Sequence, residues 1–252
     1  MMNSSDLSRW GEPFAWRGFA GRKGSHDGRN CLIIPPPHEA PGRPWIWRPE
    51  FFDAFANADE ALVRRGFHLV FLDIPDHYGC PKALDAGDAL YEFVTGTFGF
   101  APKVAFVALS RAGLTAFNWA IRNPEKVSCI YADNPVCDFK SWPAGWGCGP
   151  GSAGDWSKCL AIYGMTEDDA RAWPNNPVDR LDVLAKAGIP LLHVIGDADE
   201  VVPVTENSYV VRERYKALGG SYMEIIKPGG LHHPHGLPDP TPIAEFIVKH
   251  TR

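Results

Sequence analysis

Residues 103–107 read KVAFV, residues 108–113 read ALSRAG, and residues 114–124 read LTAFNWAIRNP. The apolar, β-prone run that ends at Leu109 predicts a strand covered on both faces. The apolar residues after Ala112 recur at helical spacing and stop before Pro124, which predicts a helix. Ser110 and Arg111 therefore interrupt a junction between a buried strand and a helix. A helix-capping serine in an ordinary turn is one explanation, so the rest of the chain has to decide.

Strand and helix patterns alternate along the chain from about residue 30. This alternation predicts an α/β fold with a mainly parallel sheet and helices on both faces. The expected strands are RNCLIIPP (29–36), FHLVFLDIP (67–75), KVAFVAL (103–109), VSCIYAD (127–133), PLLHVIGD (190–197) and YMEIIKPGG (222–230). The expected helices are residues 49–66, 82–99, from 111 onward, 178–188, 205–220 and 240–250.

Composition limits the class of protein and its partners. The chain has 252 residues, of which 45% are hydrophobic and 22% charged, and this fits one α/β domain spanning residues 1–252. The net charge of −5, with no basic run, argues against nucleic acid as the main partner. No apolar run approaches the ~20 residues of a membrane span, so we expect no membrane partner. The opening segment MMNSSDLSRWGEPF lacks the apolar core of a signal peptide, and we expect a cytoplasmic protein.

The stretch 135–177 is too long for an ordinary connection. It is rich in Gly and Pro and carries four tryptophans, Trp142, Trp146, Trp156 and Trp173. A long aromatic insert in an α/β fold is typical of a lid or a substrate wall, so the four tryptophans are candidate substrate-binding residues. The alternative is a surface excursion packed on itself.

Polar sites follow three different strands. Ser110 follows KVAFVAL, GDADEVVP (196–203) follows PLLHVI, and PGGLHHPHG (228–236) follows YMEII. Ligand sites gather at the carboxyl ends of parallel strands, so all three stretches should meet at one edge of the sheet. The chain order Ser, acid, His is the order of a catalytic triad in α/β-hydrolases.

The sequence resembles the α/β-hydrolase superfamily, in particular a bacterial esterase-like branch. The resemblance rests on GRPWIWR (42–48), LSRAG (109–113) and HHPHG (232–236), and covers roughly residues 15–250. It implies an α/β-hydrolase fold and a serine esterase that works through an acyl-enzyme, without a cofactor or a metal. The family elbow is usually G-x-S-x-G, whereas this chain has Ala108 and Ala112 at the outer positions. These positions need small side chains because strand and helix approach closely there, and Ala meets that need nearly as well as Gly.

The resemblance assigns the catalytic roles. Ser110 is the expected nucleophile, and His232 is the expected base that takes its proton. The histidine motif reads GGLHH where the family more often has GxGHH, so His233 and His235 remain rivals for the base. Asp199, three residues after the strand-ending Gly196 and shortly before VVP (201–203), is expected to orient the imidazole. Its rivals are Asp197 and Glu200.

An oxyanion hole needs two backbone N–H donors. One is expected at Arg111, which opens a helix, so that its N–H has no partner within the helix. The other is expected at Trp45, the first donor after Pro44 in the loop that follows CLII. The alternative makes Trp45 and Trp47 packing residues. The Arg111 side chain has two candidate partners, a substrate carboxylate or a neighbouring acid.

Two other function classes compete with a serine esterase. A metal-dependent hydrolase would use the three histidines at 232, 233 and 235, with His77 and Asp76 as the only obvious partners elsewhere, but would leave the serine elbow unexplained. A catalytically silent binding protein of the same fold is the other class. None of the six cysteines forms a C-x-x-C pair, and a disulfide among Cys137, Cys148 and Cys159 is open.

The expected substrate is a small-molecule or glycan ester. The insert is rich in Trp and Gly with few aliphatic residues, which does not favour a lipase. Flat aromatic faces suit sugar rings, and the esterase-like branch includes enzymes that act on decorated carbohydrates. Short acyl or methyl esters are therefore the predicted substrates, and the alcohol that carries them is either a small molecule or a saccharide.

Overall fold

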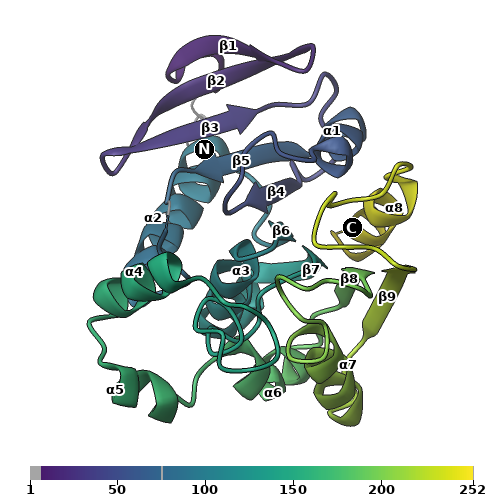
Figure 1. Ribbon diagram of the computed structural model, residues 1–252. Helices are drawn as coiled ribbons and strands as arrows, with labels where there is room; N and C mark the ends of the chain where they lie inside the picture. Colours follow the sequence, from purple (N-terminus) through teal and green to yellow (C-terminus); the bar gives the residue numbers. More distant parts are fainter. Residues whose placement is uncertain (1–6, 75, 252) are drawn as a thin grey trace.

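The computed structural model describes residues 7–74 and 76–251, and its centre is a nine-stranded sheet of order β1-β2-β3-β5-β4-β6-β7-β8-β9 (Figure 1). Strands β1, β2, β3 and β5 pair antiparallel, and every pair from β5 through β4 to β9 is parallel. The strands are β1 (Glu12–Trp16), β2 (Phe19–His26), β3 (Arg29–Ile34), β4 (Trp45–Arg48), β5 (His68–Leu72), β6 (Val104–Leu109), β7 (Val127–Asp133), β8 (Leu191–Gly196) and β9 (Tyr222–Lys227).

Helices cover both faces of the sheet. Helices α1 and α8 pack on one face, and α2, α3, α6 and α7 on the other (Figure 1). The helices are α1 (Asn57–Arg64), α2 (Pro81–Phe98), α3 (Ala112–Arg122), α4 (Ala153–Tyr163), α5 (Glu167–Ala172), α6 (Leu181–Lys186), α7 (Ser208–Ala217) and α8 (Thr241–Thr251). Short 3-10 turns lie at Leu7–Arg9, Pro124–Lys126 and Pro177–Asp179.

Strand β6 shows why the run before Ser110 is almost wholly apolar. Successive side chains of a strand point to opposite faces, so Phe106 and Ala108 join the core under α2 and α3, whereas Ala105 and Val107 join the core under α1 and α8. Both sets are fully buried. The prediction of a mainly parallel sheet with helices on both faces is confirmed. The antiparallel strands β1 and β2 precede the alternating pattern that predicted it.

The segment from Pro44 to Ala56 differs from the sequence-based expectation. Residues 45–48, expected in a loop, form the central strand β4. Residues 49–56, expected at the start of a helix, form turns, with positive φ at Phe51, Asp53 and Phe55. Three consecutive large apolar residues before Arg48 are too short a signal to reveal a strand buried on both faces.

Arg48, at the end of β4, holds this 49–56 loop in place. Its guanidinium is buried, forms an ion pair with the equally buried Asp59 at 2.6 Å, and donates to the carbonyl oxygens of Glu50, Phe51 and Ala54. A buried charge is tolerated when it is paired and hydrogen-bonded, and this one is used to fix a loop. The loop therefore has a defined path past the end of β6.

The 135–177 stretch is an insert between β7 and α6 that contains α4 and α5. Its aromatic residues form a cluster of their own. Trp156 contacts Trp146 and Phe139, with ring centroids 5.1 and 5.9 Å away, and Trp173 contacts Phe139 and Tyr163 at 6.5 and 5.9 Å. The insert thus contains a third hydrophobic core, in addition to the one on each face of the sheet.

No helix in the described part of the chain has both the length and the apolar character of a membrane span. The expected cytoplasmic location remains a prediction, and residues 1–6 of the N-terminal segment considered for it lie outside the described residues. All six cysteines are free thiols, so the structure contains no disulfide among Cys137, Cys148 and Cys159.

Candidate active site

Ser110 stands at the corner between β6 and α3 in a left-handed conformation, with φ of 52°. Its N–H donates to Asp133 O at 2.9 Å, and its carbonyl oxygen accepts from Val136 N at 2.9 Å. The flanking Ala108 and Ala112 are completely buried, as expected for the small residues of a tight strand-to-helix elbow. The turn therefore lifts the Ser110 side chain out of the sheet edge.

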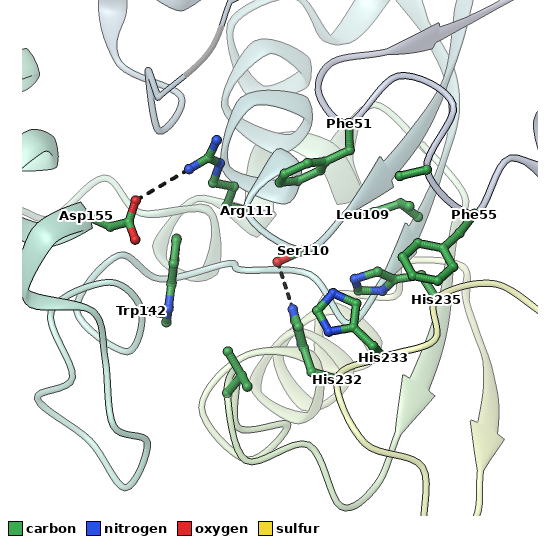
Figure 2. Close-up of a pocket in the computed structure, with 12 residues that line it drawn as sticks. Phe51, Phe55, Leu109, Ser110, Arg111, Trp142, Asp155, His232, His233 and His235 are labelled. Atoms are coloured by element: carbon green, nitrogen blue, oxygen red, sulfur yellow. Dashed lines mark hydrogen bonds and ion pairs between the residues drawn. The ribbon is translucent and has the colours of Figure 1, made fainter.

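Ser110, His232 and Asp199 form one chain of hydrogen bonds. Ser110 Oγ lies 2.9 Å from His232 Nε2 (Figure 2). His232 Nδ1 lies 2.7 Å from Asp199 Oδ2. The other carboxylate oxygen, Asp199 Oδ1, accepts from the N–H groups of Val201 and Val202 at 2.9 Å each. Both oxygens of this buried carboxylate are thus engaged, which holds the imidazole in one orientation.

The rivals for these positions lie elsewhere. His235 Nδ1 is 2.8 Å from Asp133 Oδ1, and His233 is exposed beside Phe55. Asp197 is exposed and caps the turn at Gly229, whose N–H it accepts at 2.6 Å. Glu200 is exposed. Among the histidines, His232 is the one hydrogen-bonded to Ser110 Oγ.

Asn134 joins the loops that carry the acid and the histidine. Its Oδ1 accepts from Gly196 N at 2.7 Å, and its Nδ2 donates to the carbonyl oxygens of Leu231 and His232 at 3.2 and 3.0 Å. The two loops also approach closely at Gly196, where a Cβ would lie 2.4 Å from Leu231 O. Asn134 was not singled out in the sequence, although it is the residue directly after the strand VSCIYAD.

Of the two expected oxyanion donors, Arg111 lies next to Ser110 and Trp45 lies far from it. Arg111 follows Ser110 as expected, and its N–H has no acceptor within residues 7–74 and 76–251. Trp45 begins β4, where Ile46 pairs with Ala105, so it lies about six residues, or roughly 20 Å, from Ser110 along the sheet. It is a fully buried core residue whose indole donates to Ala101 O at 2.9 Å. The assignment of Trp45 is therefore corrected, and Trp45 and Trp47 are packing residues.

Phe51, rather than Trp45, lies beside Ser110. It follows the carboxyl end of β4, next to the end of β6, and lines the same cavity as Ser110. No described residue accepts a hydrogen bond from its N–H. The strand WIWR is the signal that would have found it, since the segment beside Ser110 follows that strand rather than precedes it.

A cavity of about 400 Å³ opens over Ser110. It is lined by Phe51, Ala54, Phe55, Leu109, Ser110, Arg111, Trp142, Asp155, Val201, His232, His233 and His235 (Figure 2). Of the four tryptophans expected to bind substrate, Trp142 lines this cavity. The other three, Trp146, Trp156 and Trp173, are packed in the aromatic cluster of the insert instead, which corrects their assignment. Large aromatic residues signalled the insert, but their order along it does not reveal which ring faces inward.

The Arg111 side chain binds acids of the protein itself. Its guanidinium lies 2.6 Å from Glu50, 2.7 Å from Asp76 and 3.5 Å from Asp155. Burial raises the pKa of Glu50 to about 7, although Arg111 opposes the shift. Of the two partners expected for Arg111, the structure provides the neighbouring acid.

Comparison with solved structures identifies the fold. No protein-family model matches the sequence, and no curated protein matches it closely enough to show a family. Dipeptidyl peptidase 4 of Porphyromonas gingivalis superposes with a TM-score of 0.70 at 15% identity over 96% of this chain and 36% of its own. The acylaminoacyl peptidase of Pyrococcus horikoshii gives 0.68 at 15% over 95% and 42%, and Est1E from Butyrivibrio proteoclasticus gives 0.65 at 17% over 91% and 98%. The chain has the α/β-hydrolase fold. It spans about two fifths of the length of the two peptidases and nearly all of Est1E.

Replacing Asn134 by Ala should lower kcat by about 10- to 100-fold with a small change in KM, because a shift of about 1 Å between the loops misplaces the His232 ring. Steady-state kinetics on an activated ester measures the effect. The matched control is Asn123→Ala, which removes a buried asparagine that bonds Asp88 at 2.8 Å away from the site. An unchanged kcat in the Asn134 variant would contradict this role.

The raised pKa of Glu50 predicts a pH dependence of stability. Between the ordinary carboxyl value of 4.5 and about 7, the folded state holds a proton that the unfolded state has lost, so the free energy of unfolding should fall as pH rises. The size is on the order of 3 kcal/mol across this window. Urea unfolding of wild type and Glu50→Gln at pH 5, 6, 7 and 8 measures it. As pH rises, the free energy of unfolding of wild type should fall relative to that of Glu50→Gln. Profiles of the two proteins that run parallel from pH 5 to 8 would refute the prediction.

Proposed function

We propose that the protein is a serine hydrolase that cleaves carboxylic esters through an acyl-enzyme. The observation that carries the proposal is the chain of hydrogen bonds from Ser110 through His232 to Asp199 beneath an open cavity. A serine hydroxyl becomes a good nucleophile when an adjacent base can accept its proton, and this base is oriented by a buried carboxylate.

The steps follow from this geometry. Ser110 Oγ attacks the ester carbonyl carbon while His232 Nε2 takes its proton, and the carbonyl oxygen becomes an oxyanion. The N–H groups of Arg111 and Phe51 are the proposed donors to that oxyanion. His232 then gives the proton to the departing alcohol, which leaves the acyl group on Ser110. Water attacks this acyl ester with His232 again as base, which releases the acid and restores the serine.

The cavity supports a substrate of modest size. Its walls carry aromatic and aliphatic side chains, and Arg111, the one Lys or Arg among its described lining residues, is already paired with acids. We therefore propose short acyl or methyl esters. The proposal of a carbohydrate ester now rests on a single wall residue, Trp142, whose flat face suits a sugar ring.

Ser110→Ala should abolish ester hydrolysis without unfolding the protein, with a loss on the order of 10⁴-fold or more. Rates on p-nitrophenyl esters from acetate to octanoate measure it, and His232→Ala should lose as much because the two act as a unit. The matched control is Ser128→Ala, a buried serine at the opposite edge of the sheet that donates to Val104 O at 3.0 Å. A Ser110 variant that keeps a tenth of the wild-type rate would refute the assignment.

The same panel separates the competing functions. Peptide p-nitroanilides cleaved faster than all esters would make the protein a peptidase. Loss of activity after treatment with EDTA, restored by metal, would support a metal-dependent hydrolase that uses the histidines at 232, 233 and 235. No turnover on esters or amides, together with no labelling of Ser110 by an organophosphonate, would indicate a binding protein.

Trp142→Ala should slow turnover of the largest ester that wild type accepts, such as an acetylated or methyl-esterified glycan, by about tenfold, while p-nitrophenyl acetate changes little. An aromatic contact contributes about 1 kcal/mol, and remote contacts position the reacting ester. Trp146→Ala, a ring of the same insert packed beneath Arg171, is the matched control and should treat both substrates alike. Equal losses on both substrates in the Trp142 variant would show that this ring only supports the fold.

A further inference from the structure

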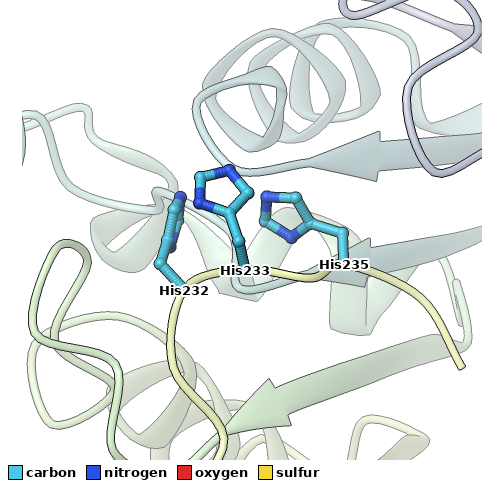
Figure 3. A group of neighbouring side chains, drawn as sticks. All are labelled: His232, His233 and His235. Atoms are coloured by element: carbon cyan, nitrogen blue, oxygen red, sulfur yellow. The ribbon is translucent and has the colours of Figure 1, made fainter.

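Three imidazole rings stand together at the mouth of the cavity. His232, His233 and His235 come from the loop after β9, and their rings lie side by side (Figure 3). The ring centroids are 4.8 to 4.9 Å apart in every pair. One nitrogen from each ring lies within 4.8 Å of the others. The proposed reaction uses one of these rings and leaves two unexplained.

Two of the three rings are each hydrogen-bonded through Nδ1 to a buried carboxylate. His232 Nδ1 bonds Asp199 at 2.7 Å, and His235 Nδ1 bonds Asp133 at 2.8 Å. Asp133 is fully buried and also accepts from Tyr131 Oη and Gly236 N. A carboxylate on Nδ1 fixes the tautomer, leaves the Nε2 lone pair available, and makes it more basic. Metal-binding histidines are usually held in this way.

The third ring is able to complete the set. His233 is exposed, stacks on Phe55 with centroids 5.7 Å apart, and has no hydrogen bond to another described residue, so it can turn at little cost.

We propose that these three histidines form an inhibitory site for a divalent transition-metal ion, for which Zn²⁺ is the probe. Zinc binds imidazole nitrogen at about 2.0–2.1 Å in a tetrahedral arrangement, which places the ligand atoms about 3.4 Å apart. Rotation of the His233 side chain brings its nitrogen toward the other two. Solvent in the cavity supplies the fourth ligand. Imidazole favours zinc, copper and nickel over magnesium and calcium.

The metal would compete directly with catalysis. The lone pair of His232 Nε2 that binds zinc is the one that accepts the Ser110 proton, 2.9 Å away. An occupied site has no free base, so hydrolysis stops until the metal leaves. The charges of Asp199 and Asp133 favour the cation, and Lys227, 3.6 Å from Asp133, offsets part of this attraction. This consequence for activity rests on the proposed function, whereas binding of the metal does not.

Binding is tested by equilibrium dialysis of Zn²⁺ against full-length protein carrying Ser110→Ala, which removes turnover. All variants also carry Cys148→Ser, because Cys148 is an exposed thiol that could bind zinc itself. We expect one zinc ion per chain. His233→Ala and His235→Ala should each weaken binding by more than about tenfold, since losing even an outer-shell partner costs 10- to 100-fold. The matched control is His38→Ala, an exposed histidine on the loop before β4, which should bind as the parent does.

No stoichiometric binding, or equal binding by the His233→Ala protein, would overturn the site. Because His233 is exposed, its loss should not unfold the chain, so this variant remains informative even if His235→Ala fails to fold.

Inhibition is tested on the Ser110-containing protein with p-nitrophenyl acetate. Zn²⁺ should inhibit reversibly, EDTA should restore the rate, and Mg²⁺ should have no effect. With each protein's rate expressed as a fraction of its own metal-free rate, half inhibition of the His233→Ala protein should need at least ten times more Zn²⁺ than half inhibition of the parent. Activation by Zn²⁺ would overturn the inhibitory role. If esters are not hydrolysed at all, the proposed function fails, and dialysis still decides whether the metal site exists.

Discussion

The backbone turn at Ser110 is the constraint on which the site depends. A left-handed conformation costs a non-glycine residue about 1–2 kcal/mol, and it persists where the surroundings determine it. Here the N–H and carbonyl groups of Ser110 are both bonded to the next strand and the segment after it, through Asp133 and Val136. Gly113 lets that segment approach, because a Cβ there would lie 2.6 Å from Val136 O. The energy of the surrounding fold thus holds a half-buried serine against the cavity at the end of a buried strand.

Buried carboxylates give the rest of the edge its order. Asp199 and Asp133 each follow or end a central strand, each is buried, and each holds one histidine of the same loop at 2.7 or 2.8 Å. A buried carboxylate must be paired and hydrogen-bonded, so each acts as a fixed point for the ring that it binds. The Asp199–His232 pair holds the proposed base. The second places another imidazole beside it, which connects the proposed catalysis with the proposed control by metal.

The sequence predicted the parts of this arrangement that depend on local patterns. Alternating runs located the strands at 104–109, 127–133 and 191–196 to within a residue or two, and the rule that sites gather at strand carboxyl ends brought Ser110, Asp199 and His232 together. It failed where tertiary contacts decide. A four-residue strand buried on both faces carries too few residues to show a period, so the pattern at WIWR predicts a loop and makes Trp45 an apparent donor. The orientation of each tryptophan in the insert depends on its packing partners, which lie on other segments. Asn134 joins the loops that carry Asp199 and His232 by side-chain bonds that no local pattern encodes.

The most direct test of the central claim is covalent labelling of the serine. The protein, incubated with a fluorophosphonate at neutral pH, should gain the mass of one phosphonyl group, and peptide mapping should place that group on Ser110. His232→Ala should be labelled far more slowly, because the hydroxyl then lacks the base that takes its proton. Labelling that maps to another residue, or that proceeds equally fast without His232, would contradict the account.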